Sequence, residues 1–218
     1  MIIHDFSKEN SLLNQFIREV RDTSIQKDSM RFRRNVERIG EILSYEMSKT
    51  LEYKAKSITT PLGLKTVNIP NSEIVLCSIL RAGIPLHQGI LNYFDGVENA
   101  FVSAYRYHPN GGDAFEVNVK YLASPSIEGK TLILADPMLA TGKTLENVLK
   151  ALENHGEPKQ IHIISIIGAK PGIELADMIF PKNTHLWIAA VDDALNERGY
   201  IVPGLGDAGD LCYGPRLD

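Results

Sequence analysis

The sequence predicts an α/β fold built on a mostly parallel sheet with helices on both faces. Between residues 74 and 191, apolar runs of strand length alternate with segments of helical spacing, as in parallel sheets whose strands are joined by crossover helices. Two of these runs are followed directly by a charged residue, Arg81 and Asp136. Ligands of such sheets bind at the carboxyl ends of the strands, so both residues are candidates for a binding site.

The chain has 218 residues, 44% of them hydrophobic, which suits a single domain over residues 1–218 with a substantial core. Its net charge of −4 disfavours a general basic face for nucleic acid or a membrane surface. No stretch approaches the roughly 20 apolar residues of a membrane span. Cys77 and Cys212 have neither a C-x-x-C spacing nor the density of a disulfide scaffold. We therefore expect a cytoplasmic protein that binds neither nucleic acid nor membranes.

Two amphipathic helices are predicted at the start of the chain, in residues 9–22 and 28–50, because apolar side chains recur there at helical spacing. The second helix carries a basic cluster of Arg31, Arg33 and Arg34. Such a cluster on an amphipathic helix is more often a solvated face or a subunit contact than an anion site. We interpret the cluster as a surface feature.

Two segments of short polar and apolar alternation predict β-hairpins. Residues 51–69 contain a proline and a glycine, typical of a hairpin or of edge strands, and we expect them to form part of a small hood over the site. Residues 101–107 and 115–121 predict a second hairpin, a flexible flap whose tip is a turn at 110–113.

Residues 74–80 form a continuous apolar run, typical of a buried strand, and a helical stretch follows to about Leu91. Arg81, Ala82 and Gly83 lie between the two. Small residues let a ligand approach the backbone, and an arginine binds phosphate through charge-assisted hydrogen bonds. A phosphate site at Arg81 is therefore predicted. The alternative is a surface arginine paired with a carboxylate.

The segment from residue 130 to 152 predicts a strand, a loop and a helix, with Asp136 at the end of the strand and Thr141 to Thr144 at the start of the helix. Backbone N–H groups and hydroxyls at a helix N-terminus bind phosphate. A carboxylate a few ångströms away suits sugar hydroxyls or a divalent cation. A phosphorylated sugar could bind this loop through both groups, with its phosphate at the helix N-terminus and its hydroxyls at the carboxylate.

Two other interpretations of the same loop are disfavoured. Gly142, Lys143 and Thr144 also match the end of the phosphate-binding loop of nucleoside triphosphatases, G-x-x-x-x-G-K-[ST]. Pro137 stands where that motif needs its first glycine, and proline has no N–H to donate. An ordinary strand-to-helix turn would not need so particular a run of residues.

The last part of the chain adds strands in residues 160–167 and 185–191, a short helix in 171–178 and a glycine-rich tail in 196–210. Closely spaced glycines let backbone groups point into a pocket. Backbone donors and acceptors of this kind can bind a planar heterocycle.

Three separated motifs resemble those of type I phosphoribosyltransferases, and of their uracil-specific branch in particular. The run from Asp136 to Thr144 is similar to the family's ribose-phosphate motif, and residues 79–83 are similar to its diphosphate-binding loop. Residues 200–210 resemble the uracil-binding tail of that branch. The resemblance extends across roughly the last two-thirds of the chain, with the motifs in the same order.

The resemblance implies transfer of ribose 5-phosphate from phosphoribosyl diphosphate to uracil, giving UMP and diphosphate in pyrimidine salvage. It implies catalytic roles for Asp136, Arg81 and Arg106. The donor-binding residues that it implies are Arg81, Arg106, Asp136, Pro137, Met138, Leu139, Ala140, Thr141, Gly142, Lys143, Thr144 and Asp207. Those that it implies for uracil are Ile201, Gly206, Asp207 and Ala208.

The resemblance also implies Mg²⁺ as a cofactor, held mainly by the diphosphate, with Asp207 as one candidate ligand. It implies a homodimer or a higher homo-oligomer and leaves GTP open as an effector.

Two positions depart from the uracil branch. Lys143 replaces a glycine, which makes the end of the loop more similar to that of purine-base relatives, and residues 107–110 replace an acidic run after Arg106. We interpret His108 in that run as a loop residue, although it could substitute for the acidic residues.

Two rival functions follow from these observations. The first is transfer to a purine base, which the tail in residues 200–210 disfavours. The second is a regulatory or RNA-binding module that uses the fold without catalysis, because a fold does not guarantee a function. Such a module should carry a basic face, and this chain is acidic.

Overall fold

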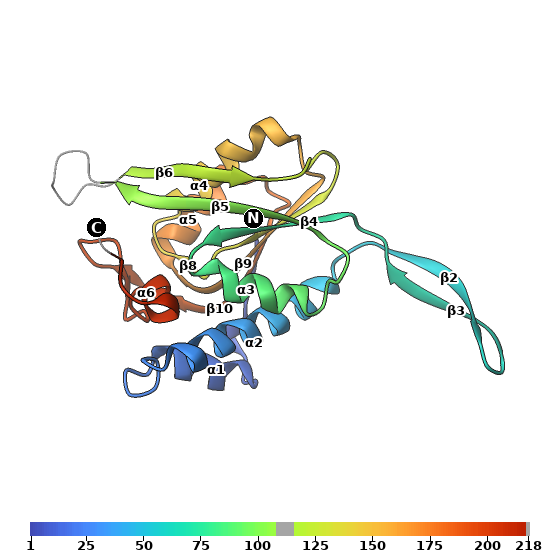
Figure 1. Ribbon diagram of the computed structural model, residues 1–218, viewed down its shortest axis with the longest axis horizontal. Coiled ribbons are helices and arrows are strands. Elements are labelled where there is room, and N and C mark those ends of the chain that lie inside the picture. Colours follow the sequence, from blue (N-terminus) through green and yellow to red (C-terminus); the bar gives the residue numbers. More distant parts are fainter. Residues whose placement is uncertain (108–115, 217–218) are drawn as a thin grey trace.

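The computed structural model describes residues 1–107 and 116–216, with the backbone alone for 104–107 and 116–118. An eight-stranded sheet forms its centre, in the order β1-β10-β9-β7-β4-β5-β6, with β8 paired to β9 (Figure 1). Neighbouring strands are parallel except for β5 and β6, which are antiparallel. The strands are β1 (Ile2–Asp5), β4 (Ile74–Leu80), β5 (Glu98–Tyr107), β6 (Glu116–Ala123), β7 (Thr131–Ala135), β8 (Met138–Leu139), β9 (Gln160–Ala169) and β10 (His185–Asp192).

Six α-helices accompany the sheet in the described residues. They are α1 (Leu13–Arg21), α2 (Ser29–Ser48), α3 (Gly83–Leu91), α4 (Lys143–Leu152), α5 (Lys170–Ile179) and α6 (Ala208–Tyr213). Short 3₁₀ turns lie at η1 (Phe6–Lys8) and η2 (Glu153–His155), and two small antiparallel pairs are formed by β2 (Tyr53–Thr60) with β3 (Gly63–Pro70) and by β11 (Ala194–Leu195) with β12 (Ile201–Val202). None of the helices described in residues 1–107 and 116–216 is both long and apolar enough to cross a membrane.

The apolar side chains of the central strands alternate between two cores, one on each face of the sheet. In β4, Leu76 packs in a cluster with apolar residues of α1, α2 and α3. Its neighbours Val75 and Cys77 belong to a second cluster, with apolar residues of α4 and α5. A strand buried on both faces needs an uninterrupted apolar run, which is why β4, β7 and β9 stand out in the sequence. The predicted parallel sheet with helices on both faces is confirmed.

The basic cluster on α2 makes contacts within the chain. Arg31 forms a two-pronged ion pair with Glu19, at 2.8 Å from Nε to Oε2 and 3.0 Å from Nη2 to Oε1. Hydrogen bonds from Arg31 and then Asn35 lower the pKa of the buried Glu19 carboxyl to about 2. Arg34 pairs with Glu37, and Arg33 donates to the carbonyl oxygen of Cys212 at 2.6 Å. Arg33 therefore helps to hold the C-terminal segment against α2.

The segment predicted as a hairpin in residues 51–69 is one, since β2 and β3 pair along their whole length. It projects from the opposite end of the molecule to α6 (Figure 1), and none of its residues lines the pocket described below. The expectation that it forms part of a hood over the site is therefore not met within the chain. The C-terminal segment, from Gly199 to Arg216, borders the pocket instead.

The second predicted hairpin is also present, as β5 and β6. Arg106 lies on β5 opposite Val117, and its side chain is outside the described residues. The predicted turn at 110–113 and His108 lie outside them as well.

Three histidines and a tryptophan stack near the start of β1, β9 and β10. His4 lies parallel to Trp187 with 3.7 Å between ring centroids, and His4 Nε2 is 3.0 Å from His185 Nδ1. Trp187 Nε1 donates to His162 Nδ1 at 3.1 Å. Burial lowers the pKa of His162 to about 3, helped by the neighbouring rings of His185 and His4, and burial also lowers the pKa values of His4 and His185.

These histidines should make the protein less stable in mild acid. Because their folded pKa values lie below the unfolded value, the unfolded chain binds more protons, and stability is complete above about pH 6.5 and falls as the pH drops towards 3. We expect the free energy of unfolding in urea to fall between pH 7 and 5 by at most about 1.4 kcal/mol per pH unit for each histidine that stays neutral. His162→Asn keeps an acceptor for Trp187 and should flatten this dependence. An equally steep dependence in that variant would contradict the assignment.

Candidate active site

A pocket of about 440 Å³ opens at the carboxyl ends of β4 and β7. Eight of the residues predicted for the site line it: Arg81, Asp136, Met138, Ala140, Thr144, Gly206, Asp207 and Ala208. Six other predicted residues do not: Pro137, Leu139, Thr141, Gly142, Lys143 and Ile201. The fold thus brings the strand-end residues and the glycine-rich tail to one place, although they are far apart in the sequence.

The loop after β4 places Arg81 at the mouth of the sheet. The peptide bond between Leu80 and Arg81 is cis. A Cβ on Gly83 would lie 2.8 Å from Ser78 Oγ and 3.0 Å from the carbonyl oxygen of Ala135, so the loop can approach β7 only with glycine there. Arg81 Nη2 donates to Asp210 Oδ1 at 2.9 Å and to the Gly214 carbonyl at 3.3 Å. Arg81 therefore both borders the pocket and ties it to the C-terminal segment.

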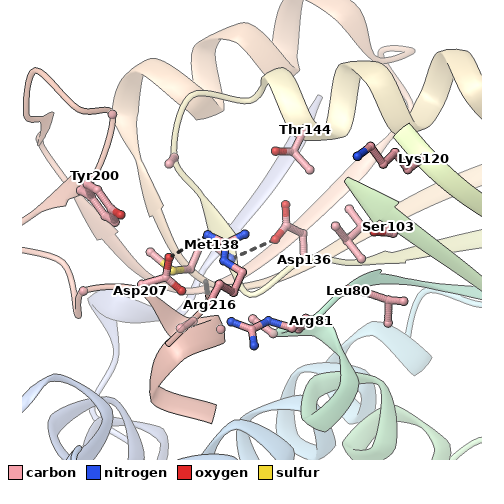
Figure 2. A pocket seen from close by; sticks show the side chains of 17 residues that line it. Leu80, Arg81, Ser103, Lys120, Asp136, Met138, Thr144, Tyr200, Asp207 and Arg216 are labelled. Atoms are coloured by element: carbon pink, nitrogen blue, oxygen red, sulfur yellow. Dashed lines mark hydrogen bonds and ion pairs between the residues drawn. The ribbon is translucent and has the colours of Figure 1, made fainter. Parts of the chain in front are cut away.

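Asp136 follows β7 and is held by the neighbouring strand β9. Its N–H donates to the carbonyl oxygen of Ile164 at 3.1 Å, and its own carbonyl accepts from Ser165 Oγ at 2.7 Å. The residue is 8% exposed. Figure 2 shows its carboxylate pointing into the pocket, on the same side as Thr144 and Lys120. Two strands thus fix a buried carboxylate where a ligand would meet it.

The loop from Pro137 to Gly142 packs against α5 on the side of the loop that faces away from the pocket. A Cβ on Gly172 would lie 2.2 Å from the carbonyl oxygen of Ala140, and Gly142 caps α4 with a φ of +80°. This packing uses Leu139, which is 1% exposed, as a core residue. Met138, Ala140 and Thr144 remain on the pocket side. The predicted helix start is confirmed, because α4 begins at Lys143.

In the tail, Gly206, Asp207 and Ala208 border the pocket at the start of α6. Gly206 has a φ of +91°, and no atom lies within 4 Å of where a Cβ would stand. Asp207 caps α6, since its Oδ1 accepts from the N–H of Asp210 at 3.0 Å. Ile201 is 4% exposed and packs in the core, so its side chain does not reach the pocket. The tail therefore borders the pocket with the backbone of Gly206 and not with the side chain of Ile201.

Several lining residues were not predicted as site residues: Ser103, Lys120, Gly199, Tyr200, Gly209 and Arg216. Figure 2 shows the Arg216 guanidinium between Asp136 and Asp207, and its Nη2 is 3.8 Å from Asp207 Oδ2. No local pattern marks Arg216, because it reaches the pocket only after the chain turns at Gly214, whose φ is +85°. Tyr200 belongs to the tail motif, which was the one signal that could have found it.

The charges around the pocket are mixed. Asp136 and Asp207 bring two carboxylates, and Arg81, Lys120 and Arg216 bring three cations. Among the described residues, no cluster of three or more histidine, cysteine, aspartate or glutamate side chains could hold a metal ion by itself. The arrangement suits a ligand that combines phosphate groups with sugar hydroxyls.

Comparison with known proteins decides the family. The sequence model described as uracil phosphoribosyltransferase matches residues 7–215. The chain belongs to the uracil phosphoribosyltransferase family. It is 51% identical over 216 residues to the uracil phosphoribosyltransferase of Porphyromonas gingivalis, which covers 99% of each chain. The family resemblance inferred from the three motifs is confirmed.

Two solved structures have folds similar to that of this chain. The AQ2163 protein from Aquifex aeolicus has a TM-score of 0.87 and 30% identity, covering 98% of both chains. A hypoxanthine phosphoribosyltransferase from Staphylococcus aureus has a TM-score of 0.51 at 18% identity, covering 85% of this chain and 83% of the other, which shows the fold alone. The predicted type I phosphoribosyltransferase-like sheet is confirmed, as is the predicted class of enzyme, a pentosyltransferase of the uracil phosphoribosyltransferase family.

Proposed function

We propose that the chain transfers ribose 5-phosphate from phosphoribosyl diphosphate to N1 of uracil in the pocket at the ends of β4 and β7. The observation that carries the proposal is that Arg81, Asp136 and the backbone at Gly206 border one cavity. The test is formation of UMP from uracil and the donor with Mg²⁺, with the donor omitted as a control. No turnover with any free base would contradict the proposal and favour a module without catalysis.

The donor would lie along the pocket with its two phosphate ends held apart. Arg81 binds the diphosphate, and the 5-phosphate meets Thr144 and the N–H groups at the start of α4. Arg106, carried on β5, is assigned to the diphosphate as well. Asp136 accepts hydrogen bonds from the ribose hydroxyls. Alignment of the two reactants is the main task that these contacts perform.

The chemical step needs no covalent intermediate with the protein. The bond from C1′ of the ribose to the diphosphate oxygen breaks, and its electron pair leaves with the diphosphate. A bond forms between C1′ and N1 of uracil, and the N1 proton is released. Positive charge develops on the ribose ring during this step, so the Asp136 carboxylate stabilises the transition state while Arg81 stabilises the leaving group.

A magnesium ion fits this pocket only together with the donor. Mg²⁺ is usually held by one or two carboxylates and by substrate phosphates, with water in the remaining positions. Asp136 and Asp207 supply two carboxylates to the pocket, and Asp207 is the candidate for a direct contact. When bound, the ion would neutralise the diphosphate and favour its departure.

The hairpin of β2 and β3 is the basis for a proposed homodimer. Leu62 is 100% exposed and Leu64 is 80% exposed, and a two-stranded hairpin is marginally stable alone in water. We assign its apolar side chains to a contact with a second copy of the chain. Light scattering during gel filtration should show a dimer for the natural sequence and a smaller particle when Leu62 and Leu64 are both replaced by serine. A monomer in both cases would contradict the assignment.

Two remaining expectations are kept as part of the proposal. Residues 1–218 are taken as one domain, because the central sheet draws its strands from residue 2 to residue 192. A cytoplasmic location is proposed because Cys77 and Cys212 are free and buried, as is usual for thiols in a reducing compartment.

The role of Arg81 gives a direct binding prediction. A charge-assisted contact to a phosphate contributes about 1.5–3 kcal/mol, so Arg81→Ala should weaken diphosphate binding by roughly 10- to 150-fold in calorimetry. Asp210→Asn is the matched control, since it removes the ion pair with Arg81 and leaves the guanidinium in place. The control should keep its diphosphate affinity. Unchanged affinity in Arg81→Ala would remove Arg81 from the site.

A further inference from the structure

Arg21, the last residue of α1, reaches the tail without lining the pocket. Its guanidinium forms two parallel hydrogen bonds with the Asp192 carboxylate, at 2.8 Å from Nη1 to Oδ2 and 2.9 Å from Nη2 to Oδ1. Nη1 also donates to the carbonyl oxygen of Gly204 at 3.0 Å. One side chain thus joins α1, the end of β10 and the tail.

Asp192 completes this arrangement from the other side. Its Oδ2 accepts from the N–H of Gly204 at 3.0 Å, and the residue is 9% exposed. Both backbone polar groups of Gly204 are therefore bound by the same ion pair. Gly204 has a φ of +62°, and a Cβ there would lie 2.1 Å from the carbonyl oxygen of Ile201, so only glycine fits at this point.

A second side chain holds the next residue of the tail. Gln26 donates to the carbonyl oxygen of Leu205 at 3.1 Å and to that of Val20, in α1, at 2.8 Å. The segment that leads to Gly206 is thus bound through its backbone at two successive residues. Since that backbone contains glycine at 204 and at 206, its own conformational preferences do not fix where Gly206 lies.

We propose that Arg21 is a positioning residue for the base, acting through Asp192 and Gly204 to set where the backbone of Gly206 meets uracil. The inference rests on the proposed base site in the tail and adds a residue from the opposite end of the sequence. A planar fork bound to a carboxylate fixes direction as well as distance, which a single contact from lysine does not. The loss of this fork should weaken uracil binding more than donor binding, because Asp136 and Thr144 are held by β7, β9 and α4 rather than by the tail.

The test compares Michaelis constants for the two substrates in a set of variants. We expect Arg21→Gln to raise the KM for uracil at least about tenfold while the KM for phosphoribosyl diphosphate changes less than about threefold. Arg21→Lys should restore part of the loss, and Gln26→Ala should produce a smaller change in the same direction. Asp192→Asn provides a second way to break the fork if Arg21→Gln does not fold.

The matched control is Arg31→Gln. It breaks another two-pronged arginine pair, with the buried Glu19, that contacts no residue of the tail. If a general loss of stability were the cause, Arg31→Gln would raise the KM for uracil to the same extent. A change of equal size in both Michaelis constants of Arg21→Gln, or an unchanged KM for uracil in Arg21→Gln and Asp192→Asn, would overturn the proposal.

A separate variant distinguishes failure of the base site itself. Gly206→Ala adds a methyl group at the edge of the pocket, on a backbone whose φ of +91° alanine rarely adopts, and by disturbing this backbone it should raise the KM for uracil. If Gly206→Ala raises it and Arg21→Gln does not, the positioning role is wrong and the base site stands. If neither raises it while the natural sequence converts uracil, both the base site and the inference fail.

Discussion

Replacing Asp136 with asparagine should lower kcat for UMP formation by about 100-fold, because in the proposed mechanism the ribose ring then loses the negative charge that stabilises it in the transition state. Asparagine has nearly the same shape and keeps an oxygen to accept from the N–H of Met138, at 3.3 Å in the natural chain. The carboxylate is buried at the pocket. The fold should therefore tolerate the change.

The measurement is steady-state turnover with both substrates saturating, together with the thermal unfolding midpoint of each protein. Asp193→Asn is the matched control, since it makes the same chemical change at an exposed residue that pairs with Lys170 outside the pocket. It should keep normal turnover. If Asp136→Asn keeps its turnover within about threefold, the transition-state role given to the carboxylate is wrong.

The parts of the site that could be predicted from sequence are those in which a charged residue comes directly after a strand. Arg81 and Asp136 each come after an apolar run, and parallel strands end at the same edge of a sheet, so their meeting follows from the pattern alone. The predicted boundaries of some elements are also close to the observed ones, since the helix predicted in residues 171–178 is α5, Lys170–Ile179. Local periodicity was sufficient for these features.

Contacts that depend on where distant segments meet could not be predicted in the same way. Arg216 enters the pocket from the C-terminal end, and Lys120 enters from β6, and neither lies in a motif. The pairing of Arg21 with Asp192 spans 171 positions and depends on how α1 packs beside β10. The hairpin of residues 53–70 was predicted as a local element, but its direction is a property of the whole molecule.

We expect the departure from the family motif at Lys143 to leave the site unchanged. The neighbouring Gly142 and Thr144 keep the loop and the start of α4, and the Lys143 side chain is absent from the residues that line the pocket. The N–H groups at a helix start do not depend on the type of side chain at that position. The similarity of this loop sequence to that of purine-base relatives is therefore weak support for a purine substrate.

The largest expected effect concerns the choice of base. The proposed base site presents backbone donors and acceptors from Gly206 and Ala208, and these groups are fixed by the cap of α6 and by the contacts of Gly204 and Leu205. Cytosine carries an amino group where uracil has a carbonyl, so a donor would face a donor. A site built to bind polar groups can reject such an analogue by roughly 10⁴-fold when its partner is left unpaired.

We therefore expect kcat/KM for cytosine to be about 10⁴-fold below that for uracil, whereas 5-fluorouracil, which keeps both carbonyls, should be converted at a comparable rate. Initial rates for uracil, 5-fluorouracil, cytosine, hypoxanthine and guanine, at saturating donor and Mg²⁺, test this directly. The cavity of about 440 Å³ must hold the donor as well as the base, so the larger purines should also react poorly. Comparable rates with hypoxanthine or guanine would overturn the assignment of the tail to uracil. A cytosine rate within tenfold of uracil would show that side chains or water, rather than fixed backbone groups, read the base.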